Sequence, residues 1–304
     1  CSRNNAPVNT HNTAIISSSQ LTISVTPLSE PEQLWKFIAA GARMRYRRAG
    51  LCSGGLMSLQ YYIGTSGWHY EHWRHRFYPD RLTKAKWLEF YASRFTTVEL
   101  NNSFYRLPSE AAFANWHDSS PTNFTFAVKV SRFITHIKRL ANTEEPVANF
   151  VARAKILEEK LGPLLYQLPP NMHRNDERLE SFLSTLPRGM KHVFEFRHQS
   201  WLDDGVFEIL HKYNIGLCVF DMPSLSCPLV ATADFAYIRF HGSTGLYSSC
   251  YSDDELADWA KRLADLAANL KEIYIYFNND AEAFAVRNAI TLRGYLQNAS
   301  LRRV

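Results

Sequence analysis

The chain has few cysteines and no long hydrophobic run. Its 304 residues include only five cysteines, and no two of them form a CxxC pair. Such an odd, scattered set fits a reduced environment better than a disulfide framework, and it comprises Cys1, Cys52, Cys218, Cys227 and Cys250. No apolar stretch approaches the roughly 20 residues that a membrane-spanning helix needs. We therefore expect a soluble, cytoplasmic protein.

A strong charge of one sign is also missing from most of the chain. The formal net charge is +5. Residues 1–57 hold six basic and two acidic residues, which accounts for +4 of this excess. The remaining 247 residues are almost neutral overall. Bulk charge therefore does not by itself predict a nucleic-acid partner.

Residues 1–57 read differently from the rest of the chain. They are rich in Asn and Ser, show little hydrophobic periodicity and end in an arginine run followed by CSGG. A transit peptide would be Arg-rich, Ser-rich and poor in acids, but Glu30 and Glu32 beside an apolar stretch interrupt that pattern. We interpret residues 1–57 as a poorly structured leader, with Met57 as the natural start and a single domain over residues 58–304.

From residue 60 onward, short β-rich runs alternate with helical stretches, which is typical of βα units on a parallel sheet. Eight strands are predicted, at residues 61–64, 96–101, 124–130, 164–167, 192–197, 216–221, 235–241 and 272–278. Helical spacing of apolar residues predicts helices over 84–95, 147–161, 177–186, 205–213, 253–270 and 281–296. A short helix is expected at 109–117 and mostly loop at 223–233. Eight units of this size predict a (β/α)8 barrel, and the alternative of a doubly wound sheet lacks a GxGxxG turn after the first strand.

Charged residues interrupt several of these strands. In KHVFEFRHQSW, residues 191–201, alternation places Glu195 and Arg197 on one face and the phenylalanines on the other. The second predicted strand carries Glu99. The seventh carries Arg239 and His241, which are two residues apart and therefore share one face. Parallel strands that are buried on both faces normally carry apolar residues throughout. We therefore expect one polar cluster where the carboxyl ends of the strands meet, although an ion network that only stabilises the fold is the alternative.

Several sequence motifs support a more specific interpretation. The segments YIGTSGW, TVELNNSFYRLP, FAVKVSRFITH, EKLGPLLYQLPP, EFRHQSW, TADFAYIRFHG and YFNND occur in this order. Together they resemble the YecE-like family, domain of unknown function 72, from Tyr62 to about Leu296. This resemblance implies a TIM-barrel fold, remotely similar to endonuclease IV and sugar-isomerase barrels, without an established activity. Residues that fall on the family's motif positions include Glu99, Asn101, Lys129, His136, Gln167, Glu195, Arg197, Asp221, Arg239, His241 and Asn278.

Candidate site residues follow from their positions at the strand ends. Carboxylates and imidazole supply acids and bases, so the candidate catalytic residues are Glu99, Glu195, Asp221 and His241. Cations, amides and loop aromatics could hold an anionic or stacked ligand, so the candidate binding residues are Trp68, Asn101, Tyr105, Lys129, His136, Gln167, Arg197, Trp201, Arg239, Asn278 and Asn279. The four catalytic candidates also suit Zn or Mn, but no motif identifies a metal, a cofactor or an oligomeric state.

Three functions are compatible with this set of residues. The first is hydrolysis or lyase-type cleavage of a phosphate-bearing or nucleic-acid substrate, with Glu195 or Glu99 as general base, His241 as general acid and Arg197 with Arg239 as an anion clamp. The second is non-catalytic binding of a nucleotide or nucleic acid through the aromatic rim. The third is sugar processing, which ranks last because Glu99 and Glu195 come from well-separated strands and glycosidases need paired carboxylates.

Overall fold

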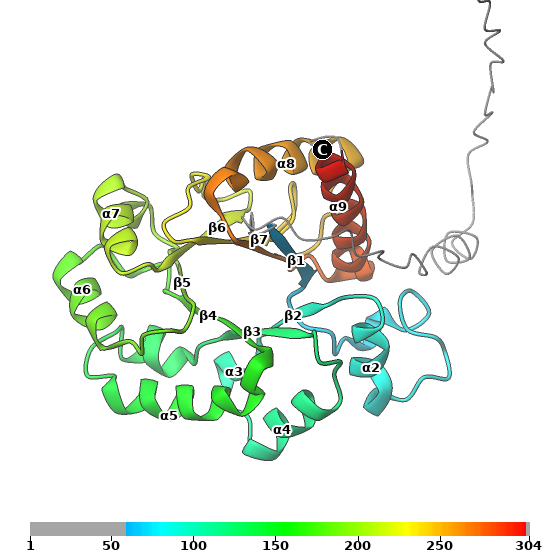
Figure 1. Ribbon diagram of the computed structural model, residues 1–304, viewed down its shortest axis with the longest axis horizontal. Coiled ribbons are helices and arrows are strands. Elements are labelled where there is room, and N and C mark those ends of the chain that lie inside the picture. Colours follow the sequence, from blue (N-terminus) through cyan, green and yellow to red (C-terminus); the bar gives the residue numbers. More distant parts are fainter. Residues whose placement is uncertain (1–58, 302–304) are drawn as a thin grey trace, which may run out of the picture. The chain divides into compact units, whose positions relative to one another are not determined.

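The computed structural model describes residues 59–301, except for the side chains at positions 269 and 299–301. The predicted leader lies outside these residues. Eight strands, all parallel, form one sheet in the order β1-β8-β7-β6-β5-β4-β3-β2 (Figure 1). They are β1 (Gln60–Thr65), β2 (Thr97–Leu100), β3 (Thr125–Lys129), β4 (Leu161–Gln167), β5 (His192–Glu195), β6 (Gly216–Asp221), β7 (Phe235–Phe240) and β8 (Glu272–Phe277).

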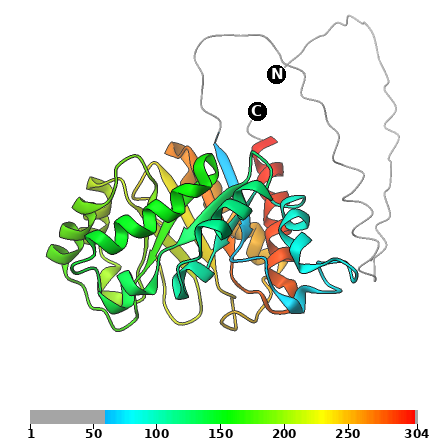
Figure 2. The same ribbon diagram turned by 90° about the horizontal axis from the view of Figure 1, so that it is seen from below.

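The sheet curves so that its two edge strands, β1 and β2, lie next to each other. A single parallel bridge joins Ser66, just beyond β1, to Glu99 of β2, so the barrel is nearly closed. Figure 2 shows the helices packed around the outside of the strands. The predicted (β/α)8 fold is therefore confirmed, with every strand within a few residues of its expected limits.

Glycine makes the close approach of β1 and β2 feasible. A Cβ atom on Gly64 would lie 2.3 Å from the carbonyl oxygen of Thr97, which is far inside van der Waals contact. The Tyr91 hydroxyl occupies the same region, where it donates to Thr97 O over 3.0 Å. Because any side chain at position 64 would push the strands apart, the seam of the barrel depends on this residue.

The helices cover the outer face of the sheet. They are α2 (Trp87–Ala92), α3 (Asn102–Tyr105), α4 (Glu110–Asp118), α5 (Glu144–Ala154), α6 (Asp176–Thr185), α7 (Asp204–Lys212), α8 (Asp253–Leu266) and α9 (Phe284–Leu301). Several begin at a residue whose side chain accepts a backbone N–H, as at Ser109, Asn175 and Asp203, and Ser252 forms a full capping box with Glu255. Residues 223–234 contain no helix, in agreement with the loop expected in the sixth unit.

Two of the predicted helices are interrupted. The helix expected over 147–161 begins earlier, at Glu144, and gives way after Ala154 to the 3-10 segment η4 (Lys155–Lys160). Glu158 has a φ of 48°, which no α-helix accommodates. The helix expected from 281 likewise starts as the short 3-10 turn η7 (Ala281–Ala283), in which Glu282 has a positive φ, before α9. Hydrophobic periodicity does not register such local breaks.

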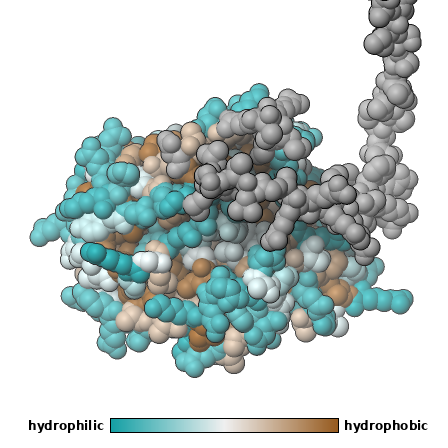
Figure 3. Space-filling view, viewed as in Figure 1, coloured by the Kyte–Doolittle hydropathy of each residue, from teal (hydrophilic) through white to brown (hydrophobic). Residues whose placement is uncertain are grey.

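The barrel interior is filled by side chains from alternating strand positions. This core consists of Ala127, Leu165, Val193, Cys218, Ala233, Phe235, Tyr237, Tyr274 and Tyr276, with Tyr62 packed against it. Hydrophilic residues predominate on the molecular face drawn in Figure 3, with hydrophobic ones scattered between them. Within residues 59–301, no helix has the length and apolarity required to cross a membrane.

Candidate functional site

Arg239 on β7 is the centre of a buried charged network. Its guanidinium donates from Nη2 to Glu99 Oε1 over 2.8 Å and from Nη1 to Glu195 Oε2 over 2.7 Å. Glu99 also accepts from Ser66 Oγ at 2.7 Å and from Tyr237 OH at 2.6 Å. All three charged side chains are 1% exposed or less. Arg239 thus links two carboxylates from β2 and β5 across the interior of the barrel.

Arg197 and His241 extend this network towards the carboxyl ends of the strands. Arg197 Nε donates to Glu195 Oε1, and its Nη2 lies 3.0 Å from His241 Nε2. Because a guanidinium only donates, His241 Nε2 must accept, and a neutral ring then carries its proton on Nδ1. Nδ1 lies 3.2 Å from Asn278 Nδ2, and since a protonated Nδ1 needs an acceptor there, the amide has to be turned by 180° so that its oxygen faces the ring.

The buried charges favour the ionised forms of Glu195 and Arg239 and the neutral form of His241. Burial alone would raise the pKa of Glu195, but Arg197 and Arg239 hold it well below its usual range. Burial and the two guanidinium groups depress the pKa of His241 well below its ordinary value. Burial acts against the charge on Arg239, yet Glu195 and Glu99 raise its pKa further. Two glutamates and two arginines therefore balance one another around a neutral histidine.

Lys129 at the end of β3 adds a cation that this balance does not require. Its Nζ lies 4.4 Å from the centre of the Phe104 ring, and among the described residues it makes no hydrogen bond or ion pair. Burial and the nearby charge of Arg239 lower its pKa to about 8. The His136 ring packs edge-on against the same phenylalanine at 5.0 Å, and burial together with Lys129 lowers the pKa of His136 to about 4.

Two uncharged amides occupy strand ends close to Lys129. Asn101, directly after β2, has a buried Oδ1 without a hydrogen-bond partner. Gln167 at the end of β4 is in register with Glu195, and its amide makes no hydrogen bond to any described residue. A buried amide oxygen without a partner is costly, so it indicates a position where a ligand or water can donate.

Asp221 does not join this cluster, although the sequence placed it there. On β6 the interior positions are Cys218, whose thiol faces Glu195 at 3.8 Å, and Phe220, which lies under the Arg197 guanidinium. Asp221 is the next residue, so it faces outward and accepts from Trp259 Nε1 of α8 at 3.1 Å. Asp221 therefore does not share the polar cluster that the sequence predicted, because it lies in the outward phase of β6, in register with Phe240 of β7.

Three other candidates also lie in packed surroundings. Asn279 is fully buried and its Nδ2 donates to Ser249 O and Asn288 Oδ1, which ties β8 to the loop after β7, whereas its Oδ1, like that of Asn101, has no hydrogen-bond partner. Trp201 is fully buried, donates to Met172 O at 2.7 Å and stacks on Phe196. Trp68 packs edge-on against Trp116. Only Tyr105 among the aromatic candidates is widely exposed, at 73%.

Sequence reasoning overlooked two hydrogen-bond donors to Glu99. Ser66 lies two residues beyond Gly64, and Tyr237 lies two residues before Arg239, so both share the interior phase of their strands. Alternation does place Tyr237 on the same face as Arg239 and His241, but its uncharged hydroxyl was not counted among the candidate site residues. Extending the same rule to Ser66 would have identified the second donor.

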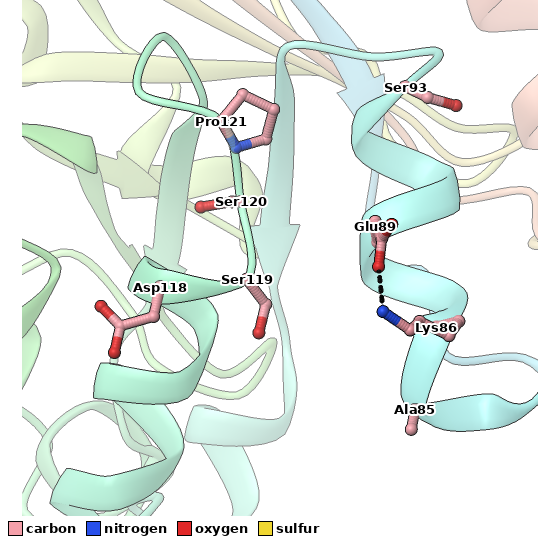
Figure 4. Close-up of a pocket in the computed structure, with 8 residues that line it drawn as sticks. All are labelled: Ala85, Lys86, Glu89, Ser93, Asp118, Ser119, Ser120 and Pro121. Carbon is pink, nitrogen blue, oxygen red and sulfur yellow. Dashed lines mark hydrogen bonds and ion pairs between the residues drawn. The ribbon is translucent and has the colours of Figure 1, made fainter.

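Two cavities of the described surface share no residue with the charged network. A cavity of about 480 Å³ lies between α2 and the end of α4, beside the Lys86–Glu89 ion pair (Figure 4). It shares no residue with the charged network, and the residues around Asp118 in Figure 4 precede β3, at the opposite end of the barrel. A second cavity, of about 690 Å³, lies between Phe133 and the start of α5.

Fold and site together define a (β/α)8-barrel protein whose charged residues gather where the strands end. A family model described as "Protein of unknown function DUF72" matches residues 62–303, and the chain belongs to this family. The UPF0759 protein YunF of Bacillus subtilis is 28% identical over 261 residues, which cover 75% of this chain and 91% of the relative.

Solved structures agree with this assignment. The crystal structure of a DUF72 family protein from Thermotoga maritima is 30% identical, with a TM-score of 0.72, and the match covers 78% of this chain and 99% of that one. A DUF72 family protein from Enterococcus faecalis is 21% identical with a TM-score of 0.70, and its match covers 78% of this chain and 96% of that one. The second likeness supports the fold alone.

Proposed function

We propose that this protein is an enzyme of the hydrolase or lyase type that acts on a phosphate-bearing substrate, with Lys129 as the residue that receives the anion. The observation that carries the proposal is the surplus charge of Lys129. Glu99 and Glu195 neutralise Arg239 and Arg197, so the ammonium of Lys129 is left without a counter-ion among the described side chains. A ligand with a negative charge would supply that counter-ion.

The same contacts argue against a clamp made by the two arginines. Both terminal nitrogens of Arg239 are engaged by carboxylates, and its side chain is 1% exposed. Arg197 is bonded to Glu195, His241 and the Met222 sulfur. We propose that these arginines orient Glu99 and Glu195 at the base of the site and balance their charge, whereas Lys129 contacts the ligand. Asn101 and Gln167 supply neutral donors and acceptors beside it.

Lys129 is also better suited to acid–base chemistry than Glu195 or His241. Glu195 is held ionised with a low pKa, which makes it a weak base at neutral pH, and His241 is neutral and accepts a hydrogen bond. A lysine with a pKa of about 8 can both hold an anion and give a proton near pH 7. We infer that, in hydrolysis, water attacks the phosphorus of a phosphate ester while Lys129 gives its proton to the leaving oxygen; the bond from phosphorus to that oxygen breaks as the bond to water forms, and the proton lost by the water returns to the Lys129 amine.

Sulfate and phosphate titrations of the full chain test this proposal, followed by a panel of phosphate mono- and diesters. We expect Lys129→Met to lower anion affinity at least about tenfold, which corresponds to about 1.4 kcal/mol. Lys138→Met is the matched control, because Lys138 also lies over an aromatic ring, that of Phe133, at 5.7 Å. Equal affinity in wild type and Lys129→Met would contradict the proposal, provided that thermal melts show both to be folded.

Single-stranded nucleic acid is the second candidate ligand. Tyr105 is 73% exposed and Phe133 is 42% exposed, and both belong to the segments that follow β2 and β3, next to Lys129. Exposed rings of this kind stack on bases with about 1–3 kcal/mol each. A labelled oligonucleotide whose affinity falls steeply with salt and drops in Tyr105→Ala would favour this function. Oligonucleotide binding that is unaffected by both salt and Tyr105→Ala would exclude this function.

A further inference from the structure

A cluster of potential metal ligands lies at the other end of the barrel. His117 is in the last turn of α4, and Glu158 and Glu159 belong to η4. One ligand atom from each of these side chains lies within 4.8 Å of the other two. Since α4 leads into β3 and η4 leads into β4, this cluster is at the amino ends of the strands, away from Lys129.

The protonation of His117 is set by its neighbour Asp118. The ring nitrogen Nδ1 lies 2.9 Å from Asp118 Oδ1, and because a carboxylate only accepts, Nδ1 must carry a proton. The other nitrogen, Nε2, is buried and has no hydrogen-bond partner. In metal sites a histidine is commonly oriented by a carboxylate in this manner, which leaves the opposite nitrogen free to coordinate.

The free nitrogen faces a carboxylate at a distance that suits a shared ion. His117 Nε2 lies 3.6 Å from Glu159 Oε1. A neutral ring would face this carboxylate oxygen with its lone pair, which is unfavourable unless Nε2 takes up a second proton and forms an ion pair, or a metal cation lies between the two atoms. Two atoms that each bind a tetrahedral ion at about 2.1 Å are about 3.4 Å apart. The observed separation is close to that value.

We propose that His117, Glu158 and Glu159 form a binding site for a divalent transition metal such as Zn²⁺. One imidazole and two carboxylates suit Zn²⁺, and water would complete the coordination shell. Lys160, the nearest buried cation, directs its Nζ to His117 O at 2.5 Å and to Ser120 O at 2.8 Å, so it engages the carboxyl end of α4. A bound ion would join α4 to η4 and thereby stabilise the lower end of the barrel.

Metal titration of the full chain tests this site after treatment with a chelator. We expect calorimetry to show one more Zn²⁺ equivalent in wild type than in His117→Ala, and Zn²⁺ to raise the melting temperature of wild type more. Glu159→Gln should weaken binding at least tenfold, and since this side chain is 53% exposed, the variant should fold. Co²⁺ should give a visible absorption band that is lost in His117→Ala.

His75→Ala is the matched control. His75 also contacts a carboxylate through Nδ1, that of Asp80 at 2.6 Å, but it belongs to no group of three ligands within the described part of the chain. We expect this variant to bind Zn²⁺ like the wild type. Equal binding by wild type, His117→Ala and Glu159→Gln would overturn the proposal, and so would an equal loss in the His75 variant.

Discussion

Replacing Arg239 by methionine should destabilise the barrel more than any surface change. The substitution keeps much of the side-chain volume but removes the cation between Glu99 and Glu195, both of which are fully buried. Glu195 would retain Arg197, whereas Glu99 would keep only hydrogen bonds from Ser66 and Tyr237. Removing one partner of a buried ion pair costs about 3–5 kcal/mol. That is a large part of the roughly 5–15 kcal/mol that stabilises a typical domain.

Urea unfolding at pH 7, followed by circular dichroism, measures this effect. Arg178→Met is a suitable control, because Arg178 is exposed on α6 and its replacement should change the free energy of unfolding by about 0.5 kcal/mol or less. Adding Glu99→Gln to Arg239→Met removes the uncompensated charge and should restore at least about 1 kcal/mol. A cost below about 1 kcal/mol for Arg239→Met, or no recovery in the double variant, would refute the reasoning.

Three further predictions concern Lys129, Trp201 and Gly64. The pKa of Lys129 is lowered from 10.5 to about 8, so the unfolded chain binds more protons than the folded chain between these pH values, and the free energy of unfolding should rise over this range. Sulfate affinity should fall above pH 8, because Lys129 loses its charge there. Both trends should be absent in Lys129→Met. Trp201→Phe leaves the Met172 carbonyl unpaired and should cost about 1–3 kcal/mol in urea unfolding without changing sulfate affinity; a change in affinity would return Trp201 to the binding site. Gly64→Ala should lower the melting temperature and reduce the free energy of unfolding by about 1–3 kcal/mol or more. Gly294→Ala should not, because no atom lies within 4 Å of its new Cβ. An unaffected Gly64→Ala protein would mean that the seam between β1 and β2 tolerates a side chain.

Strand positions and their phase were accessible from the sequence. Alternation placed Glu99, Glu195, Arg197, Arg239 and His241 on interior faces, and the structure brings these five side chains together. Asp221 was misplaced because it was chosen only for its position at the end of a strand. Alternation from the interior residues Cys218 and Phe220 puts it on the outer face, where its carboxylate accepts from Trp259 of α8.

The role of each residue depends on its contact partners, and the alternation of side chains along a strand does not identify them. Arg239 resembles an anion clamp in the sequence, but two glutamates from distant strands occupy its nitrogens. Lys129 looked no different from the other cations, and only the arrangement of its neighbours shows that it lacks a counter-ion. Trp201 follows a strand end as a ligand-binding residue would, yet its indole completes a buried hydrogen bond. These distinctions arise from contacts between segments far apart in the chain.

A crystal structure of the protein grown or soaked with tungstate, a heavy analogue of sulfate and phosphate, would show whether Lys129 receives an anion. We expect an anion at the carboxyl ends of β2 to β5, within about 3 Å of Lys129 Nζ and in reach of Gln167 or Asn101. In Lys129→Met crystals this anion should disappear while the Arg239 network stays intact. Tungstate bound only at other places, or bound identically without Lys129, would mean that Lys129 is not the anion-binding residue.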